Sequence, residues 1–363
     1  MRTVKGKLRS LAADLARYSG LLRASEFASA RFELRNGRVR RSEPKIVILC
    51  YHRIGTGGVP FYSELPTSLF EAQMRYIKSH YRIVPLAEVP QLLASGDSNP
   101  AIAVTFDDGY LGTYTEAFPI LRRHDIPATT YLTVDCIETG TLAWYDRIFL
   151  ALQVWEKNSF TIDVAGTTCK YGLNSSQTRL EAAFDINRRL RRIDDEERLA
   201  IVAEIDRRIP LPAELTRDRM LNWSHVREMQ TGNHTFGCHT MTHPAVSRLK
   251  PHQYDYELRQ SRELLEQRIG RSASDFAFPF GNPLDCGDVS AILPELGYRT
   301  ATTMNYGVNE RKTDLFRLYR FASVEDPTSL FAYKLSMLFL TGESATAPSP
   351  RMVSAEQPKG VSV

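Results

Sequence analysis

The stretch AIAVTFDDGY, residues 101–110, decides the fold. It begins as an apolar run typical of a strand buried on both faces, and it ends in Asp107, Asp108 and Gly109. Side chains alternate along a strand, so neighbouring carboxylates can share one cleft only where the backbone turns, which glycine permits. The stretch therefore predicts a buried strand with reactive groups at its carboxyl end, although a solvated turn that caps the next helix would look the same.

Similar short runs recur on both sides of this strand. Further strands are expected over residues 45–52, 81–86, 128–134, 234–239, 275–280, 298–304 and 319–324. Helices are expected over residues 67–79, 110–124, 222–231, 252–269 and 287–296. This alternation predicts a parallel sheet covered by helices, and seven or eight repeats are enough to close an α/β barrel. Functional residues of such barrels lie at the carboxyl ends of the strands.

Three segments flank or interrupt this expected domain, which spans residues 45–335. Residues 1–44 form a basic amphipathic leader and linker, residues 136–220 a mostly helical insertion, and residues 342–363 a disordered tail. The apolar side chains of the leader recur on one helical face. The leader is therefore either a helix docked on the body or a peripheral membrane contact through residues 1–23.

Charge and composition exclude several classes of protein. The chain has 363 residues and a net charge of +4, but residues 1–45 hold 12 Lys/Arg against 4 Asp/Glu, so the body is mildly acidic. An acidic body argues against nucleic acid as a partner. No apolar run approaches the ~20 residues of a membrane span. Five widely spaced cysteines and the lack of a secretory signal predict a cytoplasmic protein, with the inner face of the membrane as a candidate site of work.

A second motif, GCHTMTHP at residues 237–244, follows another expected strand. His239 and His243 are four residues apart, which places both imidazoles within reach of one metal ion. Two imidazoles and the carboxylate of Asp108 would leave coordination positions open, as in a catalytic site. Such a site can lower the pKa of water from ~15.7 toward ~7. With Asp107 free as a general base, the set predicts metal-assisted hydrolysis of an amide or ester.

A third strand end, FAFPFG at residues 276–281, carries a Pro-aromatic-Gly turn. Such a turn would fix the backbone beside the site, where an amide N–H could help to hold an oxyanion. Alone, the motif is an ordinary turn.

TFDDGY, H-T-x-x-H-P and the Pro-aromatic-Gly strand end, in this order, resemble the polysaccharide deacetylase family, also called the NodB-homology domain or carbohydrate esterase family 4. The resemblance covers roughly residues 45–335, with residues 136–220 as an insertion. It implies a distorted (β/α) barrel. It also implies metal-dependent removal of N-acetyl groups from N-acetylglucosamine-containing oligo- or polysaccharide, in exopolysaccharide or cell-envelope glycan metabolism.

The resemblance also implies roles for individual residues. Asp107 would be the general base, and Asp108, His239 and His243 would hold the metal. The backbone N–H of Phe280 would stabilise the tetrahedral intermediate. Zn²⁺ is the expected ion, although the ligand set also accepts Co²⁺, Ni²⁺ or Fe²⁺.

The chain departs from the family pattern in two places. The third motif often begins with an arginine that steadies the catalytic aspartate, but Ala277 stands there; Arg320 is a candidate for this task. The late Leu-x-His motif, which commonly supplies the general acid, is absent, since no histidine follows position 300. His52, in LCYHRI at the end of the first strand, is our candidate acid because histidine titrates near neutral pH. A structural histidine at a strand end is the competing interpretation.

Three alternatives stay open. Trp144, Tyr145 and Asp146, at the start of the insertion, would line a sugar subsite or form the small core of that segment. The missing arginine and late histidine also suit a glycan-binding protein that has lost turnover. A glycosidase is the weakest alternative, because adjacent aspartates cannot flank a sugar at the ~5 Å separation that retaining enzymes use.

Overall fold

The computed structural model describes residues 43–55, 64–95, 97–217, 219–289, 291–322 and 326–342. The expected leader helix, its membrane contact at residues 1–23 and nearly all of the expected tail lie outside these residues. In the part of the chain that is described, no helix is both long enough and apolar enough for a bilayer span.

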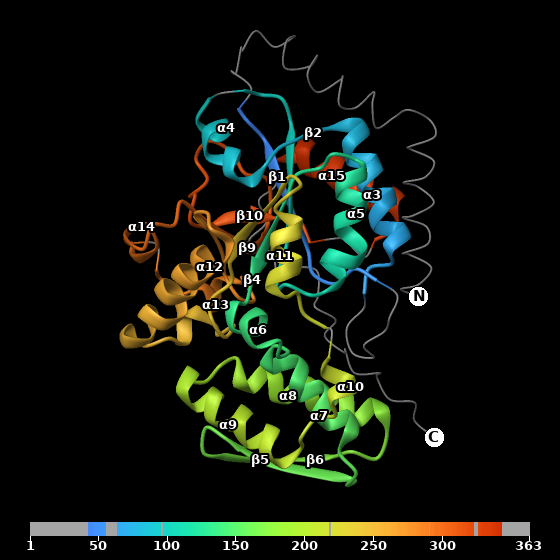
Figure 1. Cartoon of the computed structure of the whole chain (residues 1–363), viewed down its shortest axis with the longest axis vertical. Helices are drawn as coiled ribbons and strands as arrows, with labels where there is room; N and C mark the ends of the chain where they lie inside the picture. Colours follow the sequence, from blue (N-terminus) through green and yellow to red (C-terminus); the bar gives the residue numbers. More distant parts are fainter. Residues whose placement is uncertain are drawn as a thin grey trace.

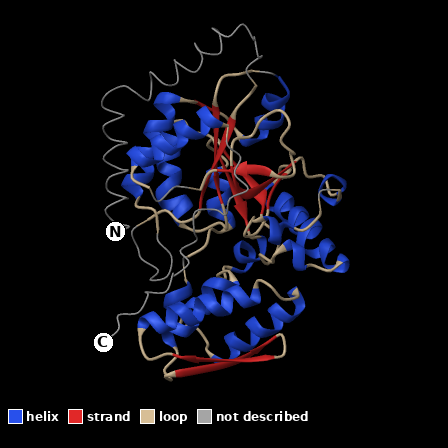
Figure 2. Cartoon of the chain, turned by 180° about the vertical axis from the view of Figure 1, so that it is seen from behind, coloured by secondary structure: helices blue, strands red, loops and turns tan. Residues whose placement is uncertain are grey.

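A parallel sheet rolled into a nearly closed barrel forms the centre of the molecule (Figures 1 and 2). Its strands follow the order β1 (Ile46–Tyr51), β3 (Ala101–Phe106), β4 (Ala128–Leu132), β7 (His234–Cys238), β8 (Asp275–Ala277), β9 (Thr300–Tyr306) and β10 (Leu318–Arg320), and β2 (Arg82–Ile83) pairs with the start of β3. Each of these pairings is parallel. The expected (β/α) barrel is confirmed.

Phe321, directly after β10, connects the two ends of the sheet. Its backbone N–H donates to the carbonyl of Ile48 at 2.8 Å, and its carbonyl accepts from the N–H of Cys50 at 3.0 Å. These bonds bring the carboxyl end of β10 beside that of β1. Residues more than 200 positions apart therefore meet at one end of the barrel.

The strands form where the sequence is continuously apolar. Every residue of β1 and β3 is buried, because side chains fill the barrel interior while helices cover its outer face. The covering helices and helical turns are η1 (Leu86–Glu88), α3 (Thr67–His80), α4 (Val89–Ser95), η2 (Thr113–Ala117), α5 (Phe118–Arg123), α11 (Trp223–Met229), η3 (Val246–Arg248), η4 (Pro251–Gln253), η5 (Asp255–Gln260), α12 (Ser261–Ile269), α13 (Pro283–Cys286), α14 (Ile292–Glu295) and α15 (Thr328–Thr341).

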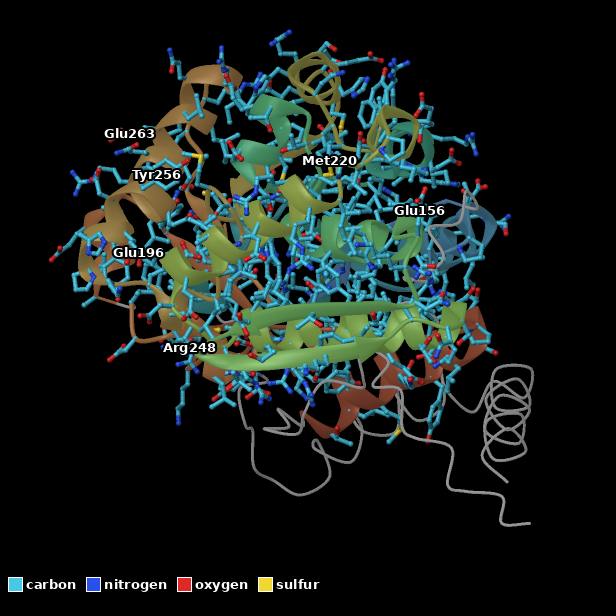
Figure 3. All side chains as sticks on the ribbon, turned by 90° about the horizontal axis from the view of Figure 1, so that it is seen from below. Glu156, Glu196, Met220, Arg248, Tyr256 and Glu263 are labelled. Carbon is cyan, nitrogen blue, oxygen red and sulfur yellow. The ribbon has the colours of Figure 1, made fainter. Side chains whose placement is uncertain are left out.

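The region of the expected insertion forms a separate layer at one end of the barrel (Figures 1 and 3). It contains α6 (Val134–Thr139), α7 (Trp144–Val154), the antiparallel hairpin β5 (Ser159–Val164) and β6 (Thr167–Gly172), α8 (Ser176–Leu190), α9 (Asp195–Arg208) and α10 (Ala213–Thr216). Its buried side chains, Phe149 and Ile186 among them, belong to the same hydrophobic cluster as Phe236 and Phe276 of the barrel. The layer therefore shares its core with the barrel.

Candidate active site

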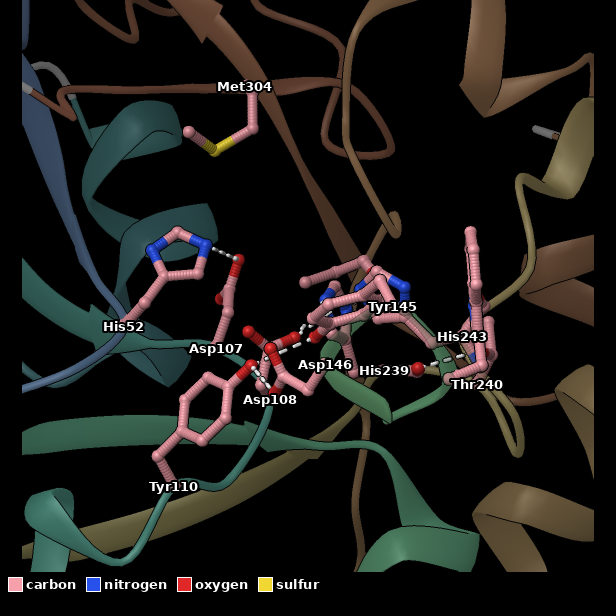
Figure 4. Close-up of polar contacts among 12 residues, drawn as sticks. His52, Asp107, Asp108, Tyr110, Tyr145, Asp146, His239, Thr240, His243 and Met304 are labelled. Atoms are coloured by element: carbon pink, nitrogen blue, oxygen red, sulfur yellow. Dashed lines mark hydrogen bonds and ion pairs between the residues drawn. The ribbon is translucent and has the colours of Figure 1, made fainter. Parts of the chain in front are cut away.

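Asp108, His239 and His243 meet at the carboxyl ends of β3 and β7 (Figure 4). One side-chain ligand atom from each lies within 4.8 Å of the others, and all three residues are buried. Oδ1 of Asp108 lies 3.6 Å from Nε2 of His239 and 3.3 Å from Nε2 of His243. The structure thus brings together the three residues that the motifs suggested as metal ligands.

Unusual backbone conformations aim these side chains at one point. Asp108 and His243 both have positive φ, at 72° and 62°, a conformation that non-glycine residues rarely adopt. Gly109 follows with φ 87°, and a Cβ there would approach Leu132 and Ile137 to 2.9 Å. Strain of this kind persists only where the surrounding structure enforces it, and it is concentrated at functional sites.

The donor set fits a divalent cation. Nδ1 of His239 lies 2.7 Å from the carbonyl of Ala277, so this nitrogen carries the proton and the lone pair of Nε2 faces Asp108. Burial lowers the pKa of His239 to about 4, which favours the neutral imidazole that a metal requires. Oδ1 of Asp108 is buried and has no hydrogen-bond partner among the described residues. A cation between this oxygen and the two Nε2 atoms would satisfy all three ligands.

Asp107, the neighbour of this cluster, is held by Arg320. Nη1 of Arg320 donates to Oδ1 of Asp107 at 2.7 Å, and Nη2 donates to Oδ2 at 2.8 Å, with both residues buried. Burial is the largest single effect and favours the protonated acid, but the charge and hydrogen bonds of Arg320, together with His239 and His52, hold the pKa of Asp107 below its usual value. Arg320 thus forms the ion pair that Ala277 cannot form.

His52 and Phe280 approach the same centre from other strands. Nε2 of His52 lies 3.8 Å from Oδ2 of Asp107, and the His52 side chain is 43% exposed, so it is open to solvent (Figure 4). Phe280 has φ 61°, and none of the described residues accepts a hydrogen bond from its backbone N–H. Its ring packs edge-on against the imidazole of His243 at 4.8 Å.

Trp144 and Tyr145 support the His243 loop. The indole N–H of Trp144 donates to the backbone carbonyl of His243 at 3.0 Å, and the ring of Tyr145 lies 4.9 Å from the His243 imidazole. The two residues are only 3% and 8% exposed. They belong to the core that joins insertion and barrel, which favours a supporting role over a sugar-lining one.

Comparison with known proteins decides the family. The family model for polysaccharide deacetylases matches residues 94–301, more than half of the chain. The chain belongs to the polysaccharide deacetylase family. Members of this family are carbohydrate de-N-acetylases, and the resemblance that the motifs indicated is confirmed.

Individual relatives agree with this assignment. The Bacillus subtilis protein YxkH, provisionally named a polysaccharide deacetylase, is 30% identical over 91 residues, which are 24% of this chain and 32% of the relative. The match therefore spans about a third of that relative's length.

Two solved structures show the deacetylase fold. The Streptococcus pyogenes deacetylase PplD, solved in complex with acetate, has a TM-score of 0.54 at 19% identity over 80% of this chain and 97% of its own. IcaB from Ammonifex degensii has a TM-score of 0.51 at 19% identity over 82% of this chain and 97% of its own.

Sequence reasoning missed an ion pair beside the Asp107–Asp108 site. Nη2 of Arg53 donates to both carboxylate oxygens of Asp146 at 2.6 Å, and the Tyr110 hydroxyl donates to Oδ2 of Asp146 at 2.9 Å. The Arg53 guanidinium also covers the Tyr110 ring at 3.8 Å. This network fastens the segment after His52 to the start of the insertion. The signals in the sequence were the position of Arg53 next to His52 and that of Asp146 beside Trp144 and Tyr145, but nothing in the sequence joined the two residues.

Glu257 of η5 was also missed, and it fixes the loop between the two histidines. Its carboxylate accepts from the N–H groups of Met241 and Thr242 at 2.9 and 3.0 Å and from the Thr242 hydroxyl at 2.7 Å. Burial raises the pKa of Glu257 to about 7. Arg198 of α9 donates to the same Thr242 hydroxyl at 3.0 Å, so the insertion contacts this loop too.

Proposed function

We propose that this chain removes N-acetyl groups from N-acetylglucosamine-containing oligo- or polysaccharide by metal-dependent hydrolysis. The observation that carries the proposal is the contrast between adjacent carboxylates. Asp108 directs an unpaired buried oxygen at two imidazoles, whereas Asp107 is paired with an arginine. One carboxylate can hold a cation while the other handles a proton.

Asp108, His239 and His243 would hold the cation. Two imidazoles and one carboxylate suit Zn²⁺, and the same set accepts Co²⁺, Ni²⁺ or Fe²⁺. When bound, such an ion acidifies a water molecule and polarises the acetyl carbonyl.

Asp107 acts as the general base in this proposal. The two hydrogen bonds from the Arg320 guanidinium favour the ionised carboxylate of Asp107 and fix its orientation. Oδ2 also accepts from the Cys50 thiol at 3.6 Å, whereas Oδ1 retains a second lone pair with which it can accept the proton of the attacking water. Preorganisation of this kind reduces the number of rotamers that the Asp107 side chain would otherwise sample before proton transfer.

His52 and Phe280 complete the reaction. His52 lies beside Asp107 and is open to solvent, so it can donate a proton to the departing amine and recover one from water. The free N–H of Phe280 would donate to the developing oxyanion, a contact that typically contributes about 3 kcal/mol to transition-state stability. Trp144 and Tyr145 would keep His243 in position.

The cellular setting is part of the proposal. We infer a role in exopolysaccharide or cell-envelope glycan metabolism, in the cytoplasm and at the inner face of the membrane. All five cysteines are free and buried, which suits a reducing compartment. Cell fractionation of the full chain, with and without residues 1–23, would test this location.

Acetate release tests the activity. Wild type, Asp107→Asn and the exposed-site control Asp163→Asn are incubated with chito-oligosaccharides and peptidoglycan fragments. We expect wild type and the control to release acetate at similar rates. The rate of Asp107→Asn should be at least about 100-fold lower, because this variant lacks the general base. If wild type binds the sugars but releases acetate from none of them, the glycan-binding alternative is favoured. Equal release by Asp107→Asn would contradict the mechanism.

A further inference from the structure

A second cluster of ligand atoms lies beside the first. Cys50, His52 and Asp107 each place one such atom within 4.8 Å of the others. Sγ of Cys50 lies 3.6 Å from Oδ2 of Asp107, and Nε2 of His52 lies 3.8 Å from the same oxygen. Cys50 and Asp107 are buried, whereas the His52 side chain is 43% exposed and gives the cluster a route to solvent.

These separations match a tetrahedral site for a thiophilic cation. With Zn–S near 2.3 Å and Zn–N and Zn–O near 2.0 Å, tetrahedral geometry places the ligand atoms about 3.3–3.5 Å apart. The Sγ–Oδ2 and Nε2–Oδ2 distances of 3.6 and 3.8 Å exceed these values by about 0.5 Å or less, and Sγ and the His52 ligand nitrogen lie within 4.8 Å of each other. One thiolate, one imidazole and one carboxylate form a set that selects zinc-like ions over Mg²⁺ or Ca²⁺.

Arg320 determines how strongly such a site would bind. Its hydrogen bonds take one lone pair on each carboxylate oxygen of Asp107, and Oδ2 also accepts from the Cys50 thiol at 3.6 Å. Loss of the thiol proton frees this second lone pair of Oδ2 for a cation, and metal-bound carboxylates commonly keep a hydrogen-bonding partner such as Arg320. Its positive charge nevertheless repels a cation. Among the described residues no arginine donates to the Asp108 carboxylate, so the Asp108 cluster should fill first and the Cys50 cluster only when metal is in excess.

We propose that Cys50, His52 and Asp107 form a second, inhibitory site for Zn²⁺ or a similar thiophilic cation. On binding, the Cys50 thiol releases its proton to solvent and the thiolate coordinates the ion together with Nε2 of His52 and Oδ2 of Asp107. Neither His52 nor Asp107 can then transfer a proton. The inhibitory effect rests on the proposed function; the site itself does not.

Cobalt absorption tests the site without any substrate. The full chain is freed of metal with a chelator and titrated with Co²⁺ while the thiolate-to-cobalt charge-transfer absorption is followed. The Asp108 cluster contains no sulfur, so we expect the band to grow only beyond the first equivalent. It should be lost in Cys50→Ser and Cys50→Ala and retained in Cys238→Ser, a matched control because Cys238 is also fully buried and directly precedes His239.

Two outcomes of the titration would overturn the proposal. The first is no band in wild type at several equivalents of Co²⁺, and the second is a band that persists in both Cys50 variants. Loss of the band in Cys238→Ser as well would assign it to another thiolate and would also overturn the proposal. Circular dichroism shows whether each variant is folded. If only one of the two Cys50 variants folds, that variant alone is enough for the titration.

Zinc inhibition tests the consequence. The rate of acetate release by each protein is measured at one and at several equivalents of Zn²⁺. The second rate is divided by the first for the same protein. We expect excess zinc to inhibit wild type and Cys238→Ser about 10-fold or more and to leave Cys50→Ser within about twofold, because loss of a ligand weakens metal affinity at least about 10-fold. Equal inhibition of all three would contradict the inhibitory role. If no acetate is released under any condition, the proposed function fails while the cobalt titration still decides the site.

Discussion

Asp107 and Asp108 are neighbours in the chain but have different surroundings. Asp108 faces two imidazoles, and Asp107 faces a guanidinium. The strand end and Gly109 were enough to predict that both carboxylates share one site, because that prediction needs only local backbone geometry. The Arg320 contact spans 213 residues of sequence, so the sequence could offer Arg320 only as a candidate.

Replacement of Arg320 should impair both stability and catalysis. Arg320→Gln leaves Asp107 buried without a countercharge, which typically costs about 3–5 kcal/mol of unfolding free energy. We expect kcat to fall at least about 10-fold, as the base loses its orientation. Arg320→Lys keeps the positive charge but loses the paired hydrogen bonds of the guanidinium. This variant should therefore retain part of the unfolding free energy and part of kcat. Urea unfolding and acetate release measure the two effects.

The control for this prediction is Arg317→Gln. Arg317 is half-buried and directly precedes β10, three residues before Arg320, but it donates to the carbonyl of Gly287 and not to Asp107. Its kcat should stay close to that of wild type. An Arg320→Gln enzyme as active and as stable as wild type would contradict the role assigned to this ion pair.

His234 should make the fold sensitive to acid. Burial lowers the pKa of His234 to about 3, against about 6.5 in an unfolded chain. Because the folded pKa is depressed, this contribution to stability is complete above about pH 6.5 and is lost as the pH falls toward 3, at about 1.4 kcal/mol per pH unit. Between pH 7.5 and 5.0 wild type should therefore lose about 2 kcal/mol more unfolding free energy than His234→Gln.

Urea unfolding at the two pH values measures this difference. The exposed histidine variant His252→Gln is the control, and it should lose as much stability as wild type. Equal losses in wild type and His234→Gln would show that His234 does not supply the acid sensitivity.

At the scale of elements, strands were more predictable than turns and short helices. The apolar runs of β1 and β3 are unambiguous, but β8 ends at Ala277, three residues earlier than expected, because Pro279 and the positive φ of Phe280 turn the chain. The helix expected over residues 287–296 is reduced to Ile292–Glu295, after Gly287 with φ 63°.

The hairpin β5–β6 was missed although its signal was present. Phe160, Ile162 and Val164 alternate with exposed residues, and Ala165 and Gly166 both take the positive φ of a tight hairpin turn. The charged helical run that follows dominated the pattern of this region. The insertion is therefore helical with a small sheet on its far side.

The contact between α7 and the histidine loop should affect metal affinity. Trp144→Phe removes the hydrogen bond to the carbonyl of His243 while it keeps an aromatic ring in the core. Because the partners that orient metal ligands commonly contribute 10–100-fold to affinity, we expect zinc binding to weaken about 10-fold. Competition with a chromophoric chelator measures the Kd.

Trp223→Phe is the matched control for this effect. Its indole N–H donates to Glu138 on the surface and not to the site. The Kd of this variant should equal that of wild type. An unchanged Kd for Trp144→Phe would show that the insertion does not support the metal ligands.

At the scale of the whole molecule, barrel closure assembles the site. Phe321 joins β10 to β1, so Arg320 and His52 reach Asp107 from opposite ends of the chain. The number of alternating elements predicted a barrel, and the ordered motifs predicted which strand ends would carry function. Neither could predict the Arg53–Asp146 pair, because it depends on how the insertion packs against the barrel. Neither could predict the Glu257 contacts either, because they depend on how η5 packs against the loop after β7.

Metal retention by variants of the two neighbouring aspartates shows which of the two carboxylates holds the metal. Wild type, Asp107→Asn and Asp108→Ala are loaded with one equivalent of Zn²⁺, passed over a desalting column and analysed for metal per chain. The ligand role of Asp108 predicts close to one zinc in wild type and in Asp107→Asn, and at least about 10-fold less in Asp108→Ala, which lacks a ligand. Retention of zinc by Asp108→Ala, or equal loss from both variants, would contradict it.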